Sequence, residues 1–201
     1  MKFKIGDETD RALCVGLRYE FLRCDDAFEA FAASAQRMIQ FGEDRRSAYR
    51  TYNAYAWFLH HLYEFMLGAV KRDRLDTASL PADLADRYVH SYIQRVLTER
   101  RDAILNGTAP SWENHISAYA EHAPLDVATA WRRQRNIISG HVSVERSQLS
   151  LTSFYERNHM YVYILYYDCK GFWGQPKDEF PHLDEITAFS VMIKAAAGAS
   201  P

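Results

Sequence analysis

Two side chains with complementary chemistry stand close together in residues 131–146, where Arg135 and Asn136 are followed by His141. Arg135 carries a permanent positive charge, and its planar guanidinium can hold a phosphate through several donors. His141 titrates near neutrality, so it can take up or release a proton at cellular pH. Together these residues form a minimal set for cutting a phosphodiester without a metal.

The same segment is locally basic. Arg132, Arg133 and Arg146 flank the motif, and the only acidic residue among them is Glu145. The whole chain has a formal net charge of −2, so no global basic excess indicates nucleic-acid binding. Any RNA site must therefore be this local patch, and Arg132, Arg133 and Arg146 are its candidate RNA-binding residues.

Helical spacing of apolar residues dominates the chain and predicts an all-α bundle, with no strand pattern. One folded domain is expected over residues 1–175, with a long helix near its C-terminal end. Residues 176–201 are expected to be a linker and a short C-terminal helix or tail. The helices of the domain are predicted over residues 9–41, 44–71, 81–105, 110–120, 124–139 and 150–172.

Composition and length indicate a globular protein in a reducing compartment. The 201 residues are 48% hydrophobic and 14% aromatic, which is enough to bury one substantial core. Cys14, Cys24 and Cys169 are odd in number and widely spaced, which argues against a disulfide framework. There is no apolar run of the length of a signal peptide or membrane span. We therefore expect a cytoplasmic protein without a membrane partner.

The motif resembles the signature of HEPN-domain ribonucleases, in which an Arg and an adjacent polar residue precede a His by four to six intervening residues. Here five residues separate Arg135 from His141, and no other Arg of the chain has a His at that spacing. The resemblance covers the motif and the helical layout. It implies that Arg135, Asn136 and His141 are catalytic and that the chain is an endoribonuclease of the toxin or antiviral-defence type.

The implied reaction uses the 2′-hydroxyl of RNA as the nucleophile. His141 would act as general base or acid, Arg135 would neutralise the phosphate, and Asn136 would orient the scissile group. The products would be a 2′,3′-cyclic phosphate and a 5′-hydroxyl end, and DNA would be untouched. No cofactor is required.

Helix geometry limits how Arg135 and His141 can meet. Six positions along an unbroken α-helix place two side chains roughly 120° apart rather than on one face. Gly140 offers one solution, because a helix that ends there allows His141 to be re-aimed. Dimerisation offers another, because HEPN nucleases usually build a composite cleft from two domains. We therefore expect a C2 homodimer with the two motifs in one cleft.

Accessory polar residues are predicted from other helices. Asn53, His60 and Glu64 recur with helical spacing on one stripe of an aromatic helix, and HEPN proteins often supply such a residue to the cleft. His159, on the polar face of the helix over residues 150–172, is a further candidate. An internal hydrogen-bond network that only fixes helix packing is the alternative explanation of the stripe.

A metal site is not expected. Glu156 and His159 form the Glu-x-x-His pair of di-iron bundles, but such a site needs a second pair and two more inward Glu residues. The only other candidate pair, Glu179 and His182, is interrupted by Pro181.

Two further alternatives stay open. In one, Arg135 and Asn136 only cap or salt-bridge a helix end, and the chain is a non-catalytic helical module that binds RNA or protein. The other concerns regulation, because HEPN toxins paired with a nucleotidyltransferase antitoxin carry a Tyr two positions after the His, where this chain has Ser143. That form of silencing is therefore in doubt, although the resemblance still allows an antitoxin or another defence-system partner.

Overall fold

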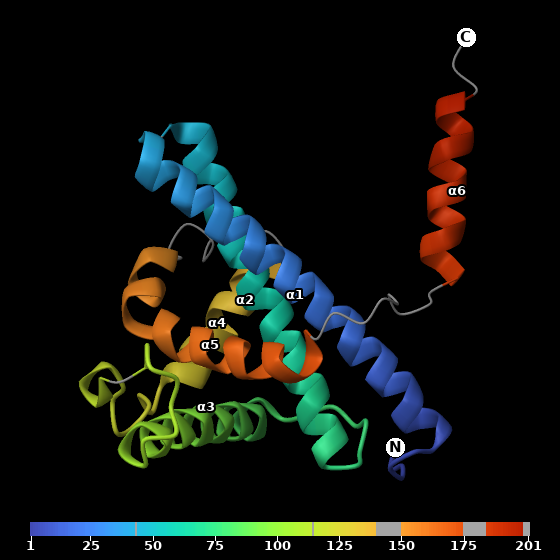
Figure 1. The fold of residues 1–201 in the computed structure, drawn as a ribbon. Coiled ribbons are helices and arrows are strands. Elements are labelled where there is room, and N and C mark those ends of the chain that lie inside the picture. The colour runs from blue at the N-terminus through green and yellow to red at the C-terminus, as the bar shows by residue number, and fades with distance from the viewer. Residues whose placement is uncertain (43, 114, 140–149, 175–183, 199–201) are drawn as a thin grey trace.

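Two long antiparallel helices, α1 (Glu8–Phe41) and α2 (Arg45–Asp73), form the most extensive helix–helix contact of the protein (Figure 1). The computed structural model describes residues 1–42, 44–113, 115–139, 150–174 and 184–198. This part of the chain is helical and contains no β-strand, only an isolated bridge between Lys2 and Asp76. The predicted all-α bundle is therefore confirmed.

Short polar residues and one glycine set the ends of the hairpin. Asp7 caps α1 by accepting a hydrogen bond from the Asp10 amide at 2.9 Å. Asp44 caps α2 through the amides of Arg46 and Ser47. Gly42 follows α1 with a φ of +83°, a conformation that side chains with a Cβ rarely adopt. These signals explain why the predicted bounds of the two helices lie within two residues of the observed ones.

The remaining helices of the bundle pack around α2. They are α3 (Ala82–Leu105), α4 (Val127–Ser139) and α5 (Leu151–Trp173). α2 contacts all four other helices of the bundle, with α1 on one side and α3, α4 and α5 on the others (Figure 1). It therefore supplies many of the largest buried side chains, among them Phe58, Leu59, Leu62, Tyr63 and Phe65.

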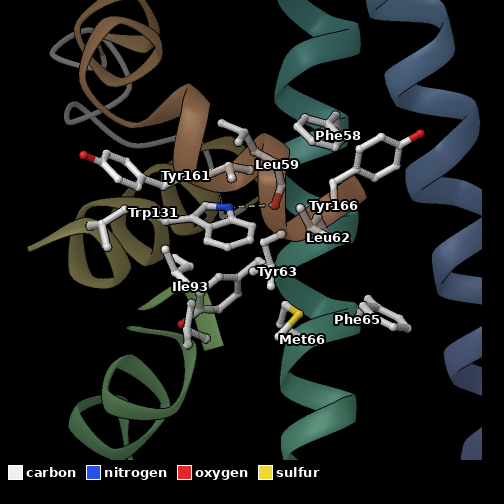
Figure 2. Close-up of a cluster of buried hydrophobic side chains, with 14 of the residues drawn as sticks. Phe58, Leu59, Leu62, Tyr63, Phe65, Met66, Ile93, Trp131, Tyr161 and Tyr166 are labelled. Carbon is white, nitrogen blue, oxygen red and sulfur yellow. Dashed lines mark hydrogen bonds between the residues drawn. The ribbon is translucent and has the colours of Figure 1, made fainter. Parts of the chain in front are cut away.

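Trp131 joins α4 to this core (Figure 2). Its side chain is fully buried, and its indole N–H donates a hydrogen bond of 3.0 Å to the Leu59 carbonyl on α2. Its ring also packs edge-to-face against Tyr63, with ring centroids 5.4 Å apart. Because one large residue makes all these contacts, it fixes the register of α4 against α2.

The predicted helix over residues 110–120 is wrong. Among the residues described in that range, only the short 3₁₀-helix η1 (Ile116–Ala118) forms, after a turn in which the Glu113 amide donates to the Pro110 carbonyl. Such a short segment gains little from its own helical hydrogen bonds, so tertiary partners decide its structure. Arg100 pairs with Glu113, and Arg101 donates to the Tyr119 carbonyl, which ties the segment to α3 in an irregular form.

The C-terminal part of the chain contains α6 (Asp184–Gly198), where the sequence predicted a short helix. This helix makes no packing contact with the other helices that the structure describes. The boundary between a folded domain over residues 1–175 and a tail over residues 176–201 stays a prediction. None of the described helices is long and apolar enough to cross a membrane.

Candidate functional site

The Arg of the motif is held by an acidic residue from another helix. Arg135, on α4, forms an ion pair with Glu64 on α2, and both side chains are partly exposed. A second guanidinium nitrogen, Nη1, donates to the Asn136 Oδ1 at 2.9 Å. The guanidinium is therefore oriented by a carboxylate and an amide while it remains within reach of solvent.

The core places this pair. Arg135 follows the buried Trp131 by one helical turn on α4, and Glu64 follows Leu59 by about one turn and a half on α2. The hydrogen bond from the Trp131 indole to the Leu59 carbonyl, drawn in Figure 2, therefore joins α4 to α2 about one turn before the residues of the ion pair. Displacement of Trp131 would separate Arg135 from Glu64.

His60 lies one turn before Glu64 on α2. The His60 ring forms a compact group with the rings of Trp57 and His61. Trp57 stacks on His61 and meets His60 edge-on. Burial and then the charge of His61 lower the pKa of His60, so this imidazole is neutral at pH 7. Arg135 contributes to the same lowering, whereas the charges of Glu64 and Glu20 act in the opposite direction.

A second carboxylate comes from α1. Glu20 Oε1 lies 2.7 Å from Nδ1 of His61. Burial alone would raise the pKa of Glu20, but the hydrogen bond with His61 and the electrostatic effects of His61 and Arg23 together outweigh it and hold that pKa below its usual value. The carboxylate is therefore ionised at neutral pH, next to two imidazoles.

Arg132 has a structural partner. Its Nε and Nη2 bind the two carboxylate oxygens of Asp86, on α3, at 2.8 and 2.9 Å. Thr129 donates to the same carboxylate at 2.8 Å. Burial alone would raise the pKa of Asp86, but the bonds from Arg132 and Thr129 lower it below its usual value. This bidentate pair joins α3 to α4, whereas Arg133 is exposed beside it.

Two of the predicted site residues, His141 and Arg146, lie outside the described residues. α4 is described to Ser139, two positions before His141. The meeting of Arg135 with His141 therefore stays a prediction.

The structure brings together some of the predicted accessory residues and not others. His60 and Glu64 lie beside Arg135, but Asn53 is eleven residues before Glu64, about 16 Å away along the same face of α2. His159 contacts Tyr55, whose hydroxyl lies 3.1 Å from the His159 Nδ1.

His159 therefore belongs to a different part of the molecule. Tyr55 and Glu64 are nine residues apart on α2, which places them on opposite faces and about 13 Å apart along the axis. The His159 ring is stacked on Tyr155 and packs against Phe31 of α1. Burial lowers its pKa to about 4, as expected for an imidazole held within an aromatic cluster.

Sequence reasoning missed Glu20, His61 and Asp86. Their partners are distant in the chain, since Glu20 lies 41 residues before His61 and Asp86 lies 46 residues before Arg132. One signal was available for the first pair. A hairpin that turns near residue 43 brings position 20 to within about two turns of position 61 on the facing helix.

Comparison with known proteins adds no identification. No family model matches the chain, and neither a curated protein nor a solved structure matches it. The interpretation of the site therefore depends on its residues alone.

Proposed function

We propose that the chain is a metal-independent endoribonuclease in which Arg135 holds the scissile phosphate and His141 transfers protons. The observation that supports the proposal is the exposure of Arg135, whose side chain remains 29% accessible to solvent. Glu64 and Asn136 orient its guanidinium at the surface, where it can still reach a phosphate. Asn136, exposed beside it, is suited to contact the phosphate or its neighbour.

The 2′-hydroxyl of RNA supplies the nucleophile. A base removes its proton, the oxygen attacks the adjacent phosphorus, and the 5′-oxygen leaves with a proton from an acid. Arg135 offsets the charge that develops on the phosphorane. A homodimer would place two imidazoles in one groove, one as base and the other as acid, and would double the positive charge around the substrate.

The test is cleavage of single-stranded RNA by the full chain in the presence of EDTA. We expect Arg135→Ala and His141→Ala each to lower kcat/KM about 100-fold or more, as is usual for loss of an acid–base or phosphate-binding group. Arg157→Ala and His122→Ala are matched controls, because both residues are exposed and lie outside the motif. Far-UV circular dichroism should be unchanged in all four variants.

The competing function is a non-catalytic helical module that binds RNA or protein. One observation favours it, because Arg132 and Arg135 already have the carboxylate partners Asp86 and Glu64. Salt-sensitive RNA binding without any cleavage product would support this function. Cleavage that persists in the double variant of Arg135 and His141 would overturn the proposed mechanism.

The resemblance to HEPN ribonucleases also implies a role as a toxin or antiviral defence effector. Expression of the wild type in a bacterial host should arrest growth and degrade total RNA, while the His141→Ala variant should not. Equal growth of the two strains, with intact RNA in both, would contradict this role. Light scattering on the purified chain tests the dimer, and a monomer would remove the composite cleft from the mechanism.

A further inference from the structure

Glu20, His60 and His61 bring three metal-ligating groups together beside the Arg135–Glu64 pair. One ligand atom from each of the three residues lies within 4.8 Å of the other two. Two imidazoles and one carboxylate are a donor set that Zn²⁺ uses in proteins. We propose that these residues form a binding site for Zn²⁺ or a similar late first-row divalent cation.

The geometry requires only modest adjustment. Zinc bonds of about 2.0–2.1 Å in a tetrahedral site place neighbouring ligand atoms about 3.4 Å apart. The contact of 2.7 Å between Glu20 Oε1 and His61 Nδ1 must open by about 0.7 Å, because a metal would replace the hydrogen bond. The widest separation must close by at most about 1.4 Å, a shift within the reach of side-chain rotation.

His60 provides a second, independent observation. Its Nδ1 atom is buried and has no hydrogen-bond partner among the described residues. Buried polar atoms are nearly always satisfied, and an unsatisfied one costs about 1–3 kcal/mol. A bound cation would satisfy a deprotonated ring nitrogen here.

Trp57 completes the surroundings of the site. It stacks on the His61 ring at 5.6 Å between centroids and meets the His60 ring at a steep angle. Such packing restricts the orientation of both imidazoles before a metal arrives. Three protein ligands leave a fourth position of a tetrahedral ion for water or an external donor.

This inference goes beyond the proposed function. Cleavage through the 2′-hydroxyl needs no metal, and Arg135 and His141 are not ligands of the site. The presence of a cation binding site and the ribonuclease activity can therefore fail separately.

The experiment uses the untagged full chain after removal of metals with a chelator. Zn²⁺ is titrated by calorimetry, and Co²⁺ is titrated by visible absorption, since tetrahedral Co²⁺ absorbs strongly. We expect one ion per chain and a loss of affinity of about tenfold or more in Glu20→Gln, His60→Gln and His61→Gln. His122→Gln, a change at an exposed histidine, is the control and should bind as the wild type does.

Two results would overturn the proposal. One is the absence of saturable Zn²⁺ binding by the wild type, and the other is equal affinity in the three site variants and the control. If His60→Gln fails to fold, Glu20→Gln decides the outcome, because glutamine can still accept a hydrogen bond from His61 but is a poor zinc ligand. RNA cleavage in EDTA, measured on the same samples, reports on the ribonuclease separately.

Discussion

Replacement of Trp131 by Phe tests how the core positions the candidate site. The change removes the indole N–H, which donates to the Leu59 carbonyl, and part of a side chain that is fully buried. The lost hydrogen bond costs about 1 kcal/mol, because the Leu59 carbonyl keeps the bond it accepts within α2. A volume roughly 40 Å³ smaller costs about 1 kcal/mol more, at about 24 cal/mol per Å³ of cavity. The expected loss in the free energy of unfolding is therefore about 2 kcal/mol.

Urea denaturation followed by far-UV circular dichroism measures this loss. With an m-value of about 2.5 kcal/mol/M, the midpoint should fall by about 0.8 M while the m-value stays constant. Trp112→Phe is the matched control, because Trp112 is 76% exposed and its replacement should change the free energy by less than about 0.5 kcal/mol. Equal midpoints for the two variants would refute the assignment of Trp131 as the anchor of α4.

The same variant links packing to activity. Since Trp131 precedes Arg135 by one turn, a loosened α4 should misplace the guanidinium and lower kcat/KM by about tenfold or more under conditions where the variant is folded. Trp112→Phe should cleave at the rate of the wild type. Full activity in a destabilised Trp131→Phe variant would show that the anchor does not control the site.

Three further changes address single interactions. Asp86→Asn should lower the free energy of unfolding by about 1–2 kcal/mol at pH 7, because Arg132 loses a charged partner. Since the pKa of Asp86 is depressed in the folded chain, the difference from the wild type should begin to shrink as the pH falls below about 4 and should be lost only below that depressed pKa; a constant difference would contradict the ion pair. The wild type should also lose stability as the pH falls from about 6.5 towards 4, because His159 takes up a proton in the unfolded chain but resists it when buried. Urea titrations should show that His159→Gln flattens the dependence of the free energy of unfolding on pH; an unchanged dependence would exclude His159 as its source. Glu64→Gln should remove the carboxylate that competes with phosphate for Arg135. Binding of a non-cleavable 2′-O-methyl RNA should therefore tighten, and the slope of log Kd against log salt should steepen by about 0.7; an unchanged affinity and slope would mean that Glu64 does not compete with phosphate for Arg135.

The helices of the bundle could be predicted because their signals are local. Apolar residues repeat with helical spacing over several turns of α1, α2 and α3, and Asp44, Gly42 and Ser150 mark helix ends within a few residues of the chain. Residues 110–120 were misassigned because Arg100 and Arg101 of α3 override the weak local preference there. Local patterns carry no information on such partners.

The candidate site was predictable only where one helix supplies its residues. Helical periodicity placed His60 and Glu64 on one face, and the motif placed Arg135 beside Asn136. An accessory polar residue from an earlier helix was predicted for the cleft, but the ion pair of Glu64 with Arg135 was not predicted. The contact of His61 with Glu20 depends on the register between two helices, which side-chain packing sets and which no short motif encodes.

Periodicity also misled where it was applied across helices. His159 and the residues beside Arg135 are all polar groups on aromatic helices, so the sequence grouped them. In the structure His159 contacts Tyr55, on the face of α2 opposite to Glu64. The face of a helix that a distant residue contacts depends on the packing of the whole bundle.

The most direct test of the central claim compares two oligonucleotides of one sequence, incubated with the wild-type chain in EDTA. One is all-ribose, and the other carries a single 2′-deoxynucleotide on the 5′ side of the bond that is cut most. The account predicts that the first is cleaved to a 2′,3′-cyclic phosphate and a 5′-hydroxyl end, and that the second resists cleavage at that bond alone. Cleavage of both at the same bond, or of neither until a metal is added, would contradict it.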